Sequence, residues 1–154
     1  MTTDLKTTEN MKIFVVDDDP FCRMMYQQHL LNQGIKDIHL FSSGPECIGS
    51  LSEQPDMIFI DFDMKPFNGL EVLKLIKQYD PSIYMVMLSA QKDIKVAVNA
   101  LRSGAFDYIS KGQDDLETIS RSVQNMLRSM GSQDAYNDRL MHNSRINNLN
   151  YFFD

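Results

Sequence analysis

Short apolar runs alternate along the chain with longer segments in which apolar residues recur at helical spacing. The short runs predict β-strands at residues 13–18, 37–41, 57–61, 84–89 and 106–111. The longer segments predict helices at residues 20–33, 44–54, 69–79, 91–103 and 114–130. Strictly alternating strands and helices are typical of βαβ units, in which right-handed crossovers build a parallel sheet.

The composition of the strands also predicts their order in the sheet. Segments 13–18, 57–61 and 84–89 are almost continuously apolar, as expected of central strands that are covered on both faces. Segments 37–41 and 106–111 alternate between apolar and polar residues, as edge strands do. The flavodoxin-like order 2-1-3-4-5 places these two strands at the edges. We therefore predict an α/β fold with a flavodoxin-like, doubly wound, five-stranded parallel sheet and helices on both faces.

The length of 154 residues suits one α/β domain. We expect residues 1–10 to form a disordered N-terminal extension and residues 11–130 to form the folded domain. Residues 131–154 are expected to be a C-terminal tail or linker. A docking helix is the alternative for this last segment, because apolar residues recur there at loosely helical spacing, at Tyr136, Leu140, Ile146, Leu149 and Phe153.

Charge and cysteine content narrow the class of protein. The net charge of −6 argues against direct binding to nucleic acid, which normally needs a basic face. Cys22 and Cys47 both fall in predicted helices, where reduced thiols are expected in a cytosolic protein. The polar N-terminus lacks the apolar core of a signal peptide, and no apolar run is long enough to span a bilayer. We expect a cytoplasmic protein that does not contact membranes.

Four of the predicted strands end in reactive polar residues: Asp17 and Asp18, Asp61, Ser89, and Lys111. Because the carboxyl ends of parallel strands meet at the same edge of a sheet, we expect these side chains to cluster. Two carboxylates about 4 Å apart repel by roughly 4 kcal/mol at an effective dielectric constant near 20. A hard divalent cation would remove that repulsion, so the cluster predicts a site for Mg²⁺ or Mn²⁺.

Such a cluster has the groups that phosphoryl transfer to a carboxylate requires. Asp61 is placed as a nucleophile that forms an acyl phosphate, Lys111 would neutralise a phosphoryl oxygen, and Ser89 would donate a hydrogen bond to another. Each residue alone has a structural explanation, since Asp18 and Ser89 precede helices as N-caps do, and most lysines are solvated. The hypothesis depends on the residues occurring together.

The order of these residues resembles the receiver domain of two-component response regulators, the group that includes the single-domain chemotaxis regulator. The similarity covers about residues 11–130 and rests on residues 15–19 (VVDDD), 61–64 (DFDM), 68–70 (NGL), 88–90 (LSA) and 107–111 (DYISK). The resemblance implies a signalling domain and not a turnover enzyme. Asp61 would accept a phosphoryl group from a sensor histidine kinase or a histidine phosphotransfer protein, and the domain would then contact an unknown downstream protein.

The resemblance also implies roles for individual residues. Asp18, Asp61 and the backbone carbonyl of Asp63 would ligate Mg²⁺ directly, and Asp17 would act mainly through a water molecule. Lys111 matches the lysine of the family's phosphorylation site.

Ser89 and Tyr108 match the family's switch pair. On phosphorylation the hydroxyl would move toward the phosphoryl group and the aromatic ring would turn inward. This would alter the face formed by the fourth helix, fifth strand and fifth helix, through which a monomer could bind a target or form a weak dimer. Val96 or Val98 would mark a partner surface if exposed, but either could instead belong to the core.

The sequence departs from the family pattern in two places. Residues 64–66 read Met-Lys-Pro where Met-Pro is usual, so the loop over the site is expected to differ in shape. Gly112 follows Lys111 in place of the usual proline, which removes a preference for a cis bond and leaves Lys111 less firmly aimed. Asp63 and Gln91 are expected to tune hydrolysis of the phosphorylated form.

Two other functions stay open at this point. The segment 61–63 resembles the nucleophile motif of haloacid-dehalogenase-like phosphatases, but that family needs an acidic pair at the end of a strand after the lysine. Asp114 and Asp115 follow Lys111 at the start of a helix instead. A receiver-like interaction module without phosphorylation is the third hypothesis, and Gly112 is its only support.

Overall fold

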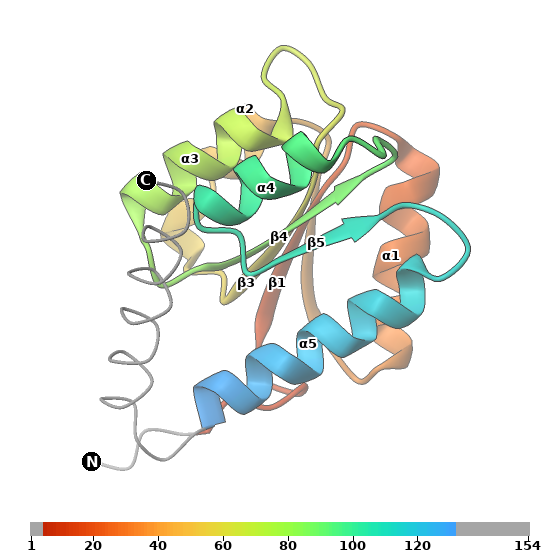
Figure 1. Cartoon of the computed structure of the whole chain (residues 1–154). Coiled ribbons are helices and arrows are strands. Elements are labelled where there is room, and N and C mark those ends of the chain that lie inside the picture. Colours follow the sequence, from red (N-terminus) through yellow and green to blue (C-terminus); the bar gives the residue numbers. More distant parts are fainter. Residues whose placement is uncertain (1–4, 132–154) are drawn as a thin grey trace.

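The structure is a computed structural model that describes residues 5–131 of the chain. Five parallel strands form one sheet in the order β2-β1-β3-β4-β5. Their bounds are β1 Lys12–Val16, β2 Asp37–Phe41, β3 Met57–Asp61, β4 Tyr84–Ser89 and β5 Asp107–Ser110. The predicted fold class, sheet order and edge strands are confirmed. Figure 1 shows β5 at one edge of the sheet, beside β4.

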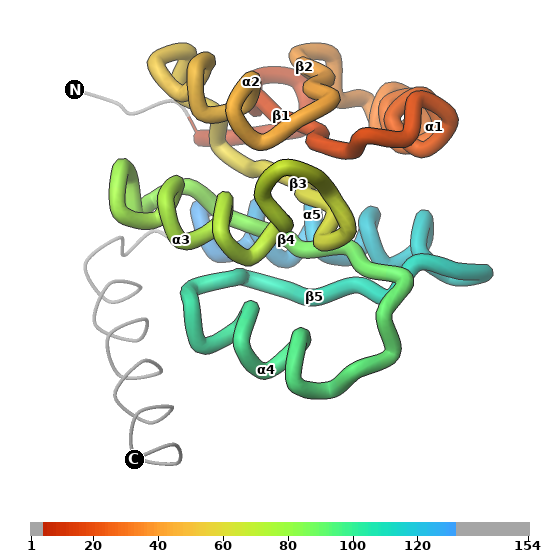
Figure 2. Tube along the Cα trace, turned by 90° about the horizontal axis from the view of Figure 1, so that it is seen from above, coloured from red at the N-terminus to blue at the C-terminus, as the bar shows by residue number. Residues whose placement is uncertain are grey.

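Helices cover both faces of the sheet, as Figures 1 and 2 show. Helices α1 and α5 pack on one face, and α2, α3 and α4 pack on the other. The bounds are α1 Pro20–Asn32, α2 Gly44–Ile48, α3 Gly69–Tyr79, α4 Ile94–Arg102 and α5 Asp115–Gly131.

Successive residues of the central strands contribute to two separate cores. Val15 and Phe59 face α1 and α5, whereas their neighbours Phe14 and Ile58 face the other helices. All four are at most 1% exposed, because central strands with two covered faces must be apolar on both.

Two predicted helices differ from the observed ones. The helix predicted at 44–54 is only the short α2, followed by a 3₁₀ turn at Leu51–Glu53, because the chain turns at Gly49 and reaches a left-handed conformation at Gln54 (φ 60°). The helix predicted at 91–103 begins only at Ile94. The Asp93 side chain accepts a hydrogen bond from the Lys95 N–H, so Asp93 is the N-cap.

The ends of the chain are described in part. Residues 1–4 of the predicted N-terminal extension lie outside the described residues, as does the predicted C-terminal tail apart from Gly131. Among residues 5–131, no helix is long and apolar enough to cross a bilayer.

An acidic pocket as the candidate functional site

Three acidic side chains converge at the carboxyl edge of the sheet. Asp17 and Asp18 follow β1, and Asp61 is the last residue of β3, the strand beside it. One ligand atom from each of the three lies within 4.8 Å of the others. Asp17 and Asp61 are buried, at 1% and 3% exposure, whereas Asp18 is open to solvent. The structure thus brings the three acids together at the topological switch point, where the crossovers after β1 and β3 run to opposite sides.

Lys111 bridges the two buried acids from the loop after β5. Its Nζ lies 2.8 Å from Asp17 Oδ2 and 3.1 Å from Asp61 Oδ1. Burial alone lowers the pKa of the Lys111 ammonium, but the hydrogen bond to Asp17 and the negative charges of both acids outweigh it, so the net pKa is raised. Lys111 is therefore charged and aimed at the cluster, although Gly112 stands where the family pattern has proline.

One cation does not fully compensate two buried carboxylates. Burial raises the pKa of Asp61 to about 6, the charge of Asp17 adds to the rise, and Lys111 opposes it. Asp61 Oδ1 forms the ion pair with Lys111, but among residues 5–131 it has no partner at hydrogen-bonding geometry. A buried carboxylate oxygen without a donor, beside two further carboxylates, fits the oxygen ligand set of a hard divalent cation.

The start of α3 is built against the backbone of Asp61. The Asn68 side chain caps the helix by accepting a hydrogen bond from the Glu71 N–H at 2.9 Å. Gly69 comes next, and a Cβ there would lie 2.4 Å from the Asp61 carbonyl oxygen. Only glycine allows this close approach, so the sequence Asn-Gly fixes the loop that carries the site.

The two residues matched to the switch pair both contact Gln91. Ser89 is fully buried, and its Oγ accepts a hydrogen bond from the Gln91 backbone N–H at 2.9 Å. The Tyr108 hydroxyl donates to the Gln91 carbonyl oxygen at 3.0 Å, and Gln91 Nε2 donates to Asp63 Oδ1 at 3.2 Å. The sequence pointed to Gln91 only as a neighbour of the site, because these contacts depend on the path of the loop after β4.

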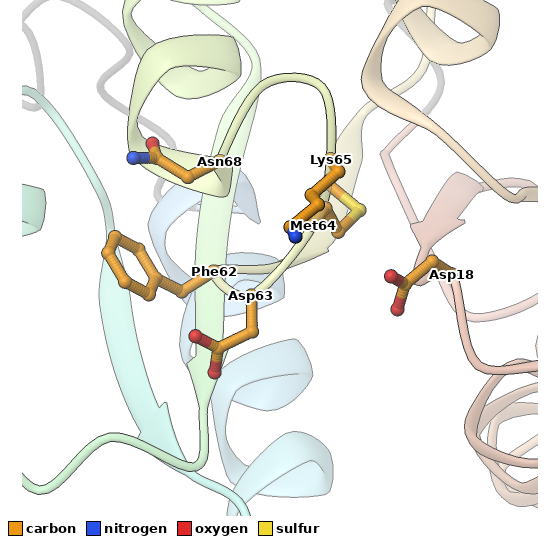
Figure 3. A pocket seen from close by; sticks show the side chains of 6 residues that line it. All are labelled: Asp18, Phe62, Asp63, Met64, Lys65 and Asn68. Carbon is orange, nitrogen blue, oxygen red and sulfur yellow. The ribbon is translucent and has the colours of Figure 1, made fainter.

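A pocket of about 300 Å³ opens beside the acids. Figure 3 shows Asp18 on one side of this pocket, facing the loop between β3 and α3. The residues that line it are Asp18, Phe62, Asp63, Met64, Lys65 and Asn68. Lys65 places an exposed cation on the rim at a position where the family pattern has proline.

Fold and site together define a doubly wound α/β domain with an acidic cluster at the carboxyl edge of its sheet, and comparison with known proteins gives the family. Residues 13–124 match the model of the response regulator receiver domain. The chain therefore belongs to the receiver domain family. Phosphorylation and Mg²⁺ binding at an acidic pocket are general properties of that family.

Individual relatives support the same family assignment. The chain is 32% identical over 116 residues to the chemotaxis protein CheY of Bacillus subtilis, covering 73% of this chain and 97% of the relative. It is 35% identical over 109 residues to the DNA-binding transcriptional regulator NtrC of Escherichia coli, covering 70% of this chain but only 23% of the relative. A two-component response regulator from Clostridium difficile has a similar structure, with a TM-score of 0.74, 27% identity, and coverage of 80% and 100% of the two chains.

Proposed function

We propose that this receiver domain accepts a phosphoryl group on Asp61 from the phosphohistidine of a sensor kinase or a histidine phosphotransfer protein. The observation that carries the proposal is the group of three carboxylates within 4.8 Å of one another, of which two are buried and bridged by Lys111. Lys111 supplies one positive charge for these three acids, and among residues 5–131 the buried Oδ1 of Asp61 has an ion pair with Lys111 but no hydrogen bond.

The proposed step is an in-line transfer. A carboxylate oxygen of Asp61 forms a bond to phosphorus while the bond from phosphorus to the donor imidazole nitrogen breaks, and the electron pair leaves with the imidazole. Lys111 neutralises charge on the transferred group, and the Ser89 hydroxyl donates to one of its oxygens. Because the chemistry asks little more than positioning and charge neutralisation, no further catalytic base is needed.

The residues present fit a Mg²⁺ ion. Asp18, Asp61 and the backbone carbonyl of Asp63 would hold it, with Asp17 acting mainly through water. When bound, the ion would supply charge neutralisation and orientation for the phosphoryl group.

For the downstream partner, we propose the face formed by α4, β5 and α5. Ile94 and Leu101 are two turns apart on α4 and are 75% and 41% exposed. Val96 instead packs against the core, and Val98 is half-buried. Movement of Ser89 toward a phosphoryl group would change the contacts of Tyr108, which lies on β5 and packs on the α4 side of the sheet, and so shift a two-state equilibrium.

The phosphodonor protein needs a surface beside the cleft, and the first turns of α1 offer one. Asp19 caps α1 directly after Asp18, so this helix starts at the mouth of the site. Phe21 and Met24 on its outer side are 71% and 66% exposed. When a donor histidine reaches Asp61, the protein that carries it must contact the start of α1. Burial of Phe21 and Met24 in that contact would stabilise the complex.

Incubation with acetyl phosphate and Mg²⁺, followed by intact mass measurement, tests the proposal. We expect one phosphoryl group per chain in the wild type and none in Asp61→Asn. Release of many equivalents of phosphate per chain from phosphate esters would favour the phosphatase alternative. Absence of any adduct with an active donor would favour the interaction module without phosphorylation.

The docking surface has a separate test. In Phe21→Asp and Met24→Asp, phosphotransfer from a histidine phosphotransfer protein that phosphorylates the wild type should fall by about tenfold or more, since hot-spot residues cost at least 1–2 kcal/mol. Phosphorylation by acetyl phosphate should be unchanged, because this small donor does not need the surface. An equal loss with both donors would contradict the assignment.

A further inference from the structure

We infer that Gln91 is a positioning residue that couples the loop after the phosphoacceptor to Tyr108, by a route separate from the Ser89 hydroxyl. Its role in signalling rests on the proposed function of Asp61, whereas the coupling itself is a property of the unphosphorylated protein.

Gln91 connects three parts of the site with three different groups. Its side-chain Nε2 donates to Asp63 Oδ1 at 3.2 Å, across the gap between the loop after β4 and the loop after β3. Its backbone carbonyl accepts from the Tyr108 hydroxyl at 3.0 Å. Its backbone N–H donates to Ser89 Oγ at 2.9 Å.

The Asp63 end of this route reaches the phosphoacceptor. Asp63 follows Asp61 by two residues, and its backbone N–H is among the groups that act on the Asp61 carboxylate. Asp63 and Asp18 both line the pocket that Figure 3 shows. A charge or ligand added at Asp61 therefore acts on the loop that holds the acceptor of the Gln91 side chain.

The Tyr108 end is held by one hydroxyl contact. Tyr108 is half-buried and packs against the core on the α4 side of the sheet. The segment between Ser89 and the N-cap Asp93 lies outside β4 and α4, and the hydrogen bonds of Gln91 to Ser89, Asp63 and Tyr108 anchor it. Loss of the Asp63 contact leaves the Gln91 N–H held by Ser89 Oγ, so the Gln91 carbonyl can turn about that anchor and the Tyr108 hydroxyl loses a fixed partner.

The proposed coupling has two arrangements: in the observed one, hydrogen bonds link Asp63, Gln91 and Tyr108, and in the other the bond between Asp63 and Gln91 is broken. Such a two-state element is what physical coupling between a site and a distant face requires. The two side chains of the link are exposed, so substitutions there should leave the fold intact.

The test is a double-mutant cycle read out at Tyr108. The full chain is labelled with 3-fluorotyrosine, and the ¹⁹F resonance of Tyr108 is assigned by its loss in Tyr108→Phe. We expect Asp63→Ala and Gln91→Ala each to move this resonance, although Gln91→Ala keeps the backbone carbonyl. The double variant should move it no further than Gln91→Ala alone, because both substitutions break one contact.

Conservative and neighbouring variants distinguish coupling from general disturbance. Asp63→Asn keeps an acceptor oxygen for Gln91 Nε2 and should keep the wild-type resonance. Lys92→Ala changes an exposed side chain in the same loop and should also leave it in place. An unmoved Tyr108 resonance in Asp63→Ala, or additive shifts in the double variant, would overturn the inference.

The outcome is independent of phosphorylation. If no adduct forms on Asp61 but the cycle is non-additive, the coupling stands and the proposed function fails. If the adduct forms and the shifts are additive, the proposed function stands and Gln91 does not couple the loops.

Discussion

Two buried aspartates of this domain have opposite surroundings. Asp115, at the start of α5, is 7% exposed and accepts a hydrogen bond from the buried Tyr26 hydroxyl at 3.2 Å. Asp61 is 3% exposed, one of its oxygens has no hydrogen-bond donor in the described part of the chain, and its pKa is raised to about 6, mainly by burial. Both carboxylates are out of water, but Asp115 accepts a hydrogen bond from a neutral hydroxyl, whereas Asp61 shares the Lys111 cation with a second buried acid.

The difference separates an acid that holds the fold together from one that is available for chemistry. A buried polar group is normally paired, and an exception needs an explanation. At Asp61 the explanation that we propose is a site whose further partners, a metal ion and a phosphoryl group, come from outside the chain. The comparison therefore predicts that substitutions at Asp61 and Asp115 affect different properties.

The largest expected effect is on phosphorylation by acetyl phosphate. Asp61→Asn should abolish the phosphoryl adduct, whereas Asp115→Asn should keep its rate within about twofold, because the two sites share no partner. Intact mass spectra over time measure both. A comparable loss of adduct in the two variants would contradict the proposal that Asp61 and Asp115 have different roles.

Lys111→Met should give the largest loss of stability. It leaves Asp17 and Asp61 without their shared cation, and the free energy of unfolding should fall by about 2–3 kcal/mol in urea without Mg²⁺. Combination with Asp61→Asn should recover part of this loss, because only one buried carboxylate then remains. Lys74→Met, on the exposed side of α3, is the matched control and should change stability by less than about 0.5 kcal/mol. Equal effects of the two lysine variants would show that the acids do not need compensation.

Mg²⁺ should stabilise the domain through the acidic cluster. At a concentration about tenfold above its dissociation constant, the gain should be about 1.4 kcal/mol, and it should rise further with concentration. Thermal unfolding with and without the ion should show this gain in the wild type and in Asp115→Asn, and a much smaller one in Asp18→Ala. An undiminished gain in Asp18→Ala would place the ion elsewhere.

The smallest expected effect is on stability, when Asp115 loses its hydrogen-bond donor. Tyr26→Phe removes the donor to Asp115 without changing the packing, and stability should fall by about 1 kcal/mol. Phosphorylation of Asp61 should continue at the wild-type rate. If this variant also slowed phosphorylation, the contact between α1 and the start of α5 would belong to the site as well.

The sheet and the position of its polar edge could be predicted from the sequence because both follow from periodicity. Short continuous apolar runs that alternate with helical segments are typical of central strands, and strand ends in a parallel sheet share one edge. That reasoning places Asp17, Asp61 and Lys111 together before any contact is known. The family resemblance then supplies roles that spacing cannot, such as that of Tyr108.

Other features depend on contacts that periodicity does not report. The partner of Asp115 is Tyr26, 89 residues away, and nothing in the local pattern of either helix indicates the pair. The helix predicted at 91–103 extended over Gln91, which in fact belongs to a loop held by side chains. Local capping by Asp93 overrides the apolar spacing there.

The central claim is that Asp61 is the residue phosphorylated. Borohydride reduces an aspartyl phosphate to homoserine, so reduction of the protein treated with acetyl phosphate and Mg²⁺, followed by peptide mass spectrometry, locates the group. The account predicts homoserine at position 61 and aspartate at positions 17, 18 and 63. Homoserine at another position, with Asp61 unmodified, would contradict it.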